Sequence, residues 1–153
     1  MRVYRIVSAT HARTAFSGDG ALFTEGRWHS RGRRVVYTSA SEAAARLEIL
    51  AHWAAPDLLP AQVRITADLP DDVSSDSIDT RLLPAGWDRP PPYLRTVQRL
   101  GDRWLAHGTS LVLRVPSALS PSDRHLLINP LHSEMALLRI TATDPCSFDT
   151  RLV

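Results

Sequence analysis

Two segments of this chain repeat apolar residues at helical spacing, and most other apolar residues fall into short runs typical of strands. Val3–Ser8 and Gln62–Leu69 alternate between apolar and polar residues, as half-buried strands do. Val35–Thr38 and Ser110–Val115 are short, apolar and rich in β-branched residues, which favours buried strands. The chain has 153 residues, the length of one domain, so this mixture predicts a single compact α+β domain over residues 1–153.

The first predicted helix covers Glu42–Trp53, a segment rich in Ala and Leu. Ser39 precedes Glu42 by three residues, which is the spacing of a capping box, and Pro56 is expected to end the helix.

The second predicted helix covers Tyr93–His107, and Gly108 is expected to stop it. Its inward face is predicted to contain Leu94, Val97, Leu100, Trp104 and Leu105. Leu126–Ile140 is apolar but ambiguous between helix and strand. Residues 9–34 form a long Gly- and Arg-rich stretch, and residues 70–92 are a polar, Pro-rich surface excursion.

Composition narrows the class of protein. Hydrophobic residues make up 44% and charged residues 22% of the chain, values that exclude an acidic disordered or a collagen-like protein. No apolar run approaches the roughly 18 residues that a membrane-spanning helix needs. The N-terminal residues lack the apolar stretch of a secretory signal, and the lone Cys146 cannot form an intrachain disulfide. We therefore expect a cytoplasmic protein.

All 18 basic residues are Arg, although the formal net charge is only +2. Several of them lie in Gly26–Arg34, directly before the strand that carries Tyr37. A flexible backbone, several guanidinium groups and a nearby aromatic ring suit an anion, because Arg pairs with phosphate oxygens through charge-assisted hydrogen bonds. The alternative is a solvated basic loop, and composition alone does not decide between the two.

Glu48 is a candidate because it shares a stripe of the first helix with small residues that would let a substrate approach its carboxylate. These neighbours are Ala44, Ala51 and Ala55. The alternative is an ordinary exposed helix surface, since Ala is simply the best helix former.

A serine beyond the last clear strand is the third candidate. Ser117 follows the strand and Pro116, and Ser110 begins the same segment. Spacing does not choose between the two serines. No Gly-x-Ser-x-Gly elbow surrounds Ser117, so a hydrolase nucleophile is not indicated.

Taken together, these segments resemble the RES-domain family, the toxins of bacterial toxin–antitoxin pairs. The matching pieces occur in family order along nearly the whole chain: Val3–Ile6, Gly26–Trp28, Val36–Ser39, Leu47–Glu48, Trp104–Leu105, Leu113–Ala118 and Asn129–His132. The sequence departs at His29, where the family often has Asn after the loop Trp.

The resemblance implies a fold like that of ADP-ribosyltransferases, with a central mixed or antiparallel sheet, flanking helices and a cleft that binds NAD⁺ as substrate. By matching positions it implies Glu48, Arg5 and Ser117 as catalytic residues, with Arg27, Tyr37 and Asn129 binding NAD⁺. The Val-Pro-Ser context favours Ser117 over Ser110. No metal is expected, and no His-x-x-x-His or Cys-x-x-Cys pair occurs.

The family's activity implies a toxin of a type II toxin–antitoxin system that cleaves the nicotinamide–ribose bond of NAD⁺ by hydrolysis or phosphorolysis. Transfer of ADP-ribose to a protein is the alternative within the enzyme class. The resemblance also implies an Xre-like helix-turn-helix antitoxin as partner, with DNA contacted through that antitoxin. It leaves a homodimer open.

A nucleic-acid-binding module without enzymatic activity is the alternative from another class. The Arg31–Arg34 cluster and a pI near 9.2 support it. The absence of a helix-turn-helix pattern and of alternating aromatic and basic residues opposes it.

Overall fold

A seven-stranded sheet organises the computed structural model, which describes residues 1–53, 60–149 and 151–152. The order across the sheet is β4-β5-β6-β2-β1-β3-β7, and every described neighbouring pair is antiparallel except β4 and β5. The strands are β1 (Arg2–Ser8), β2 (Val36–Ser39), β3 (Gln62–Asp68), β4 (Ser75–Ser77), β5 (Val112–Pro116), β6 (Arg124–Ile128) and β7 (Arg139–Cys146). The predicted α+β class with a mixed sheet is confirmed.

The sheet consists of two well-paired halves. One half contains β4, β5, β6 and β2, the other contains β1, β3 and β7, and the two meet at a single register pair between β2 and β1. β1 pairs with β3 along its whole length, from Arg2 opposite Asp68 to Ser8 opposite Gln62. β1 and β2, in contrast, are in register only at Tyr4 and Ser39. Beyond this pair the strands diverge, and their side chains are free to border a space between the halves.

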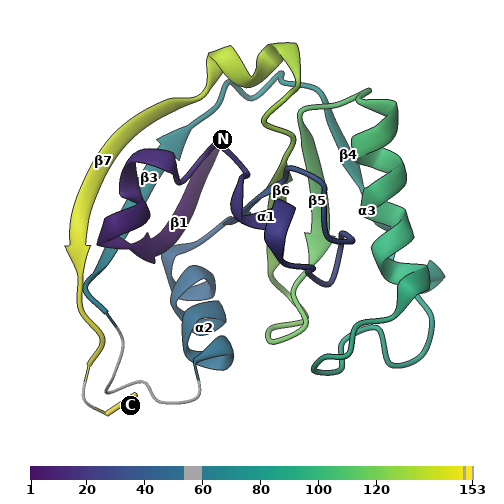
Figure 1. Ribbon diagram of the computed structural model, residues 1–153, viewed down its shortest axis with the longest axis horizontal. Helices are drawn as coiled ribbons and strands as arrows, with labels where there is room; N and C mark the ends of the chain where they lie inside the picture. The colour runs from purple at the N-terminus through teal and green to yellow at the C-terminus, as the bar shows by residue number, and fades with distance from the viewer. Residues whose placement is uncertain (54–59, 150, 153) are drawn as a thin grey trace.

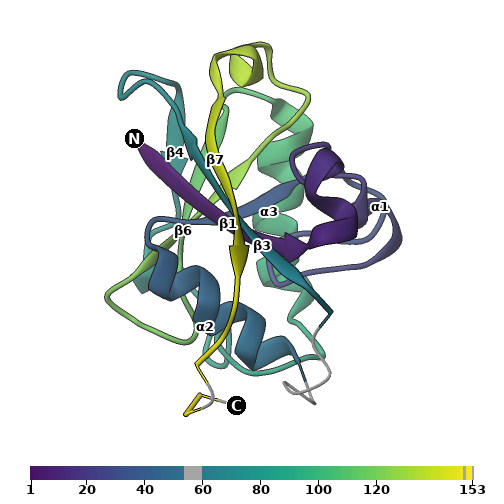
Figure 2. The same ribbon diagram turned by 90° about the vertical axis from the view of Figure 1, so that its left-hand side faces the viewer.

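In the described part of the chain, three α-helices and three 3-10 turns accompany the sheet. The helices are α1 (Gly20–Phe23), α2 (Glu42–His52) and α3 (Arg95–His107), and the 3-10 turns cover Ala9–Thr14, Thr80–Leu82 and Ser133–Leu137. Figure 1 shows α2 below β1, between the two halves of the sheet, with α3 beside β4 and β5. Figure 2 shows the β7 edge toward the viewer and α3 behind it. Within the described ranges, no helix is long and apolar enough to cross a membrane.

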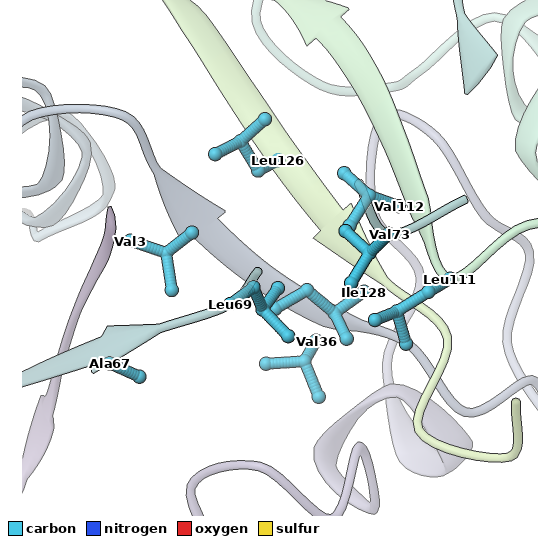
Figure 3. Close-up of a cluster of buried hydrophobic side chains, with 9 residues drawn as sticks. All are labelled: Val3, Val36, Ala67, Leu69, Val73, Leu111, Val112, Leu126 and Ile128. Carbon is cyan, nitrogen blue, oxygen red and sulfur yellow. The ribbon is translucent and has the colours of Figure 1, made fainter. Parts of the chain in front are cut away.

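Strand alternation divides the apolar residues of β5 and β6 between the two faces of the sheet. One face carries the cluster in Figure 3, to which both halves contribute: Val3, Val36, Ala67, Leu69, Val73, Leu111, Val112, Leu126 and Ile128. On the other face Leu113, Val115 and Leu127 pack against Val97 and Trp104 of α3. A smaller cluster of Ile6, Ala45 and Cys146, flanked by Ile49, attaches α2 to β1.

α3 also holds the loop that contains Arg27 and Trp28. Gly101 lies so close to this loop that a Cβ built on it would be 1.8 Å from the carbonyl oxygen of Trp28. Gln98, buried on the same helix, donates from Nε2 to the carbonyl of Gly26 at 3.1 Å. The backbone of the loop is therefore fixed against α3 on both sides of Arg27.

The predicted strands and both long helices are confirmed, but the predicted cap of α2 is wrong. Ser41 is the N-cap residue, and its hydroxyl accepts a hydrogen bond from the Ala44 N–H at 3.1 Å. Ser39 remains in β2, where its backbone is extended and pairs with Tyr4. The expected stop at Pro56 lies outside the described residues, as does Ala55.

Three further expectations are corrected by the structure. Leu94 is 38% exposed because it precedes α3 as its N-cap residue instead of lying on the buried face. The ambiguous tail divides into β6, a 3-10 turn and β7. The excursion over residues 70–92 contains β4, which pairs in parallel with β5 and was not predicted because Ser75–Ser77 lacks apolar residues.

Gly101→Ala is expected to lower the free energy of unfolding by about 1–3 kcal/mol, because the new methyl group must push α3 away from the Trp28 backbone. Gly20→Ala is the control, since a Cβ there meets nothing within 4 Å. Chemical denaturation of both variants tests this, and equal stability would contradict the close contact.

Candidate active site

A cavity of about 440 Å³ lies where the two halves of the sheet diverge. Its volume falls within the range of small-molecule sites. β1 contributes Tyr4 and Arg5, β2 contributes Tyr37 and Ser39, and α2 contributes Glu48 and His52. The loop before β2 adds Arg27 and His29, and the remaining wall includes Tyr93 and His125. The sequence-predicted Arg5, Arg27, Tyr37 and Glu48 thus line one cavity.

Glu48 faces this cavity from α2 and lies between two histidines. Its Oε1 is 2.8 Å from Nε2 of His125, and its Oε2 is 3.6 Å from Nδ1 of His52. The Nε2 contact is close but poorly aligned, since His125 Nε2 has no partner in hydrogen-bond geometry among the described residues. The Glu48 side chain keeps 31% of its surface exposed, so the carboxylate is accessible to a ligand.

The surroundings of Glu48 favour its ionised form. Burial is the largest single influence and raises the pKa of the carboxyl. His125, followed by the positive charges of His52 and Arg27, acts in the opposite direction and brings the pKa below its ordinary value. The cavity therefore contains a carboxylate, not a carboxylic acid, at neutral pH.

Arg5 bridges the two halves of the sheet. Its Nη1 donates to the carbonyl of Tyr37 at 2.6 Å, next to the point where β1 and β2 diverge. Burial lowers the pKa of Arg5 to about 10, so the guanidinium is still charged at neutral pH. Its Nε has no hydrogen-bond partner among the described residues, which leaves part of the donor capacity of this group unused.

Arg27 is held by the segment before α3. Its Nη1 donates to the carbonyl oxygens of Trp87 and, at 2.9 Å, of Arg89. Its guanidinium carbon lies 5.0 Å from the ring centroid of Tyr93, in a cation–π arrangement. These contacts fix one edge of the guanidinium and place its positive charge at the cavity wall.

Tyr37 connects β2 to the same loop through its hydroxyl group. The oxygen accepts from the Trp28 N–H at 3.2 Å and lies 2.8 Å from Nδ1 of His29. Nε2 of His29 lies 3.2 Å from the Thr24 carbonyl, an acceptor, so Nε2 carries the proton and Tyr37 donates to Nδ1. Burial lowers the pKa of His29 and raises that of Tyr37, which keeps both groups neutral.

The structure does not bring the other predicted residues into the cavity wall. Ser117 is buried, and its hydroxyl accepts from the N–H groups of Leu119 and Ser120, both at 3.2 Å. Asn129 caps a turn, with Oδ1 accepting from Leu131 N at 3.1 Å. Ser110 accepts from Trp104 Nε1 at 2.8 Å, beneath α3. Neither Ser117 nor Asn129 belongs to the described residues that line the cavity, and their catalytic and binding roles stay predictions.

The sequence analysis proposed no role in the site for several other polar or aromatic wall residues, among them Ser39, His52, Tyr93 and His125. His52 carries a local signal, because it follows Glu48 by four residues on one helix face. His125 carries none, since it reaches the cavity through the pairing of β6 with β2. Ser39 belongs to the Val36–Ser39 segment of the family resemblance but was interpreted only as a helix cap.

The cavity thus combines the accessible Glu48 carboxylate with two guanidinium groups from other elements, and Asp19 and Glu25 add carboxylates from the segment before β2. A carboxylate can stabilise positive charge that develops on a bound molecule, and the guanidinium groups can hold its anionic part. Among the described residues, no group of three or more His, Cys, Asp or Glu side chains is placed to hold a metal ion.

Comparison with known proteins identifies the family. The model of the RES domain matches residues 2–149. A protein of Pseudomonas putida named Toxin Res is 39% identical over 130 residues, which cover 84% of this chain and 86% of that protein. Another Toxin Res, from Photorhabdus laumondii subsp. laumondii, is 34% identical over 131 residues, covering 86% of this chain and 83% of that protein. The chain therefore belongs to the RES-domain family of toxins.

Two further comparisons concern activity and fold. The Prs ADP-ribosylating toxin of a Sphingobium species is 32% identical over 151 residues, covering 95% of this chain and 93% of that protein. A chain in the crystal structure of the M. tuberculosis MbcT–MbcA toxin–antitoxin complex has a similar fold, with a TM-score of 0.78 at 18% identity. The match covers 95% of this chain and 84% of that chain.

The His52→Gln variant is expected to raise the pKa of Glu48, because it removes a positive charge that favours the carboxylate. Titration of ¹³C-labelled Glu48 by NMR measures this directly, and the pKa in the wild-type protein should lie below 4.5. His107→Gln, at the exposed end of α3, serves as control.

The same shift has a consequence for stability. Folding lowers the pKa of Glu48, so the ionised carboxylate contributes to the free energy of unfolding. This contribution is present above the pKa of Glu48 in the unfolded chain and is lost as the pH falls through the pKa in the folded protein. An unchanged Glu48 pKa in His52→Gln would contradict the electrostatic account of the site.

Proposed function

We propose that this RES-domain toxin binds NAD⁺ in the cavity and cleaves the bond between nicotinamide and ribose. The observation that carries the proposal is the position of the Glu48 carboxylate in one cavity with Arg5 and Arg27. Family membership supports it, as does the name of the ADP-ribosylating relative, since ADP-ribosylation breaks the same bond of NAD⁺.

Cleavage needs a group that stabilises positive charge on the ribose. When the bond between C1′ and the nicotinamide nitrogen breaks, the electron pair leaves with nicotinamide and the ribose acquires oxocarbenium-like character. A carboxylate beside the sugar stabilises this charge, as in glycosidases. Glu48 is assigned this role, either directly or through the ribose hydroxyls, and its lowered pKa keeps it ionised.

The two arginines are assigned to the pyrophosphate or ribose of NAD⁺. Arg5 has donor capacity beyond its bond to Tyr37, and Arg27 is fixed in place by two backbone carbonyls. Tyr37 supplies a neutral aromatic ring at the wall for the nicotinamide. Ser117 and Asn129 lie outside the described wall and bond to the turns after β5 and β6, and their catalytic and NAD⁺-binding roles stay predictions.

The acceptor of the ribosyl group is water or inorganic phosphate. With water, an oxygen–C1′ bond replaces the nitrogen–C1′ bond, and the products are ADP-ribose, nicotinamide and a proton. A protein side chain is the second candidate acceptor, which the name of the Sphingobium relative favours. Incubation with labelled NAD⁺ separates these outcomes: free ADP-ribose indicates hydrolysis, its phosphorylated form phosphorolysis, and a labelled protein band transfer.

Neutralisation by an antitoxin completes the proposal. The structural neighbour was solved as a toxin–antitoxin complex, which supports a cognate antitoxin for this chain. An Xre-like antitoxin, a type II system and a cytoplasmic location follow from the family resemblance. A carboxylate-bearing segment of the antitoxin would compete with NAD⁺ for the two arginines.

Glu48→Gln is expected to keep the fold and to lose roughly 10²-fold or more in turnover of NAD⁺, because the neutral amide no longer stabilises the ribosyl cation. Release of nicotinamide measures the rate. Glu42→Gln, on the same helix but outside the described cavity wall, should stay close to wild type. NAD⁺ consumption by Glu48→Gln at the wild-type rate would end the assignment.

Arg27→Lys is expected to raise the Michaelis constant for NAD⁺ about tenfold or more, because an ammonium group cannot reproduce the planar set of donors. Arg31→Lys, on the exposed part of the same loop, is the matched control. Steady-state kinetics of both variants decide the matter, and an unchanged Michaelis constant in Arg27→Lys would place this side chain outside the binding site.

A further inference from the structure

His125 is a buried ionisable residue of the cavity wall that the mechanism above does not use. It lies on β6, directly opposite Ser39 of β2 in the antiparallel register, and only 8% of its surface is exposed. Its ring lies between two side chains from other elements. Nδ1 is 3.0 Å from the Ser39 hydroxyl, and Nε2 is 2.8 Å from Oε1 of Glu48.

Glu48 and the Ser39 hydroxyl together favour one tautomer of the His125 ring. The carboxylate only accepts, so it favours a proton on Nε2, whereas the hydroxyl can either donate or accept. This hydroxyl makes no other side-chain hydrogen bond in the described part of the chain, so it is free to donate to Nδ1. Nδ1 then accepts, and the proton of the neutral ring resides on Nε2, the nitrogen next to Glu48. Because Ser39 and His125 occupy paired strands, the ring has a fixed position relative to the sheet.

Glu48 needs such a fixed partner, because its long side chain projects from the last turns of α2 and has several torsions to restrict. His52 is a weaker anchor, since it lies 3.6 Å away and 60% of its side chain is exposed. His125 is the closer contact and comes from the sheet, not from the helix. It therefore fixes the carboxylate relative to the sheet, in which β1 with Arg5 lies beyond β2.

We propose that His125 is a positioning residue for NAD⁺ cleavage: its Nε2–H, supported by a Ser39 hydroxyl that donates to Nδ1, holds the Glu48 carboxylate toward the ribose. This inference rests on the proposed function. His125 contacts Oε1 of Glu48, so Oε2 remains available to the developing ribosyl cation. The two atoms lie within hydrogen-bond distance at 2.8 Å, and catalytic hydrogen bonds commonly reach full alignment only in the substrate complex.

The test compares variants of His125 in the full chain. His125→Leu should lower kcat about 10- to 100-fold with little change in the Michaelis constant, because misplacement of a catalytic group affects the transition state more than substrate binding. His125→Gln places an amide donor in the same region and should recover at least about tenfold of the kcat lost in His125→Leu. His107→Leu, exposed on α3, is the control.

A double-mutant cycle separates this inference from the proposed function. In the Glu48→Gln background, His125→Leu should have no further effect, since it acts only through the carboxylate. If Glu48→Gln retains kcat, the proposed function fails. If Glu48→Gln loses activity but His125→Leu keeps the wild-type kcat, only the positioning role fails.

A spectroscopic measurement keeps the inference testable even if His125→Leu does not fold. The ¹⁵N chemical shifts of neutral His125 in the wild-type protein should show the proton on Nε2, and Ser39→Ala should shift the ring toward a mixture of tautomers. A proton found on Nδ1 in the wild-type protein would overturn the proposal.

Discussion

The hydrogen bond from Arg5 to the Tyr37 carbonyl connects two strands that pair with each other at only one position. Continuous pairing of β1 with β2 would leave no space between them, because neighbouring strands lie about 4.8 Å apart. The divergence opens a cavity inside the sheet, and the guanidinium group satisfies a carbonyl that would otherwise lose its strand partner. The architecture thus places a permanent positive charge at the point where the halves separate.

The remaining elements bring complementary groups to this charge. α2 attaches to β1 through Ile6 and Ala45 and thereby directs Glu48 to the same space. On the other side, α3 holds the Trp28 loop by a contact so close that only glycine fits at position 101. Arg27 therefore approaches the cavity from a rigid support, although it lies on a loop. Glu48 and the two guanidinium groups line one cavity because three separate packing arrangements agree.

The fold class could be predicted from the sequence because local patterns encode it. Four of the six site residues that the family resemblance implies line one cavity, and their roles remain proposals. Alternation gave the strands at Val3–Ser8 and Gln62–Leu69, and helical spacing with Gly108 at the end gave α3. The cap of α2 was misplaced because Ser39 and Ser41 both precede Glu42, and only strand pairing distinguishes them. His125 could not be predicted for a similar reason. It lies near Glu48 because β6 pairs with β2, which brings His125 opposite Ser39, a residue 86 positions away in the sequence.

A crystal structure of the Glu48→Gln variant with NAD⁺ tests the central claim most directly, since the slow variant should retain intact substrate. The account predicts the nicotinamide ribose beside residue 48, with the pyrophosphate next to Arg5 or Arg27. Density for NAD⁺ at another surface, with the cavity between β1 and β2 occupied by solvent alone, would contradict it.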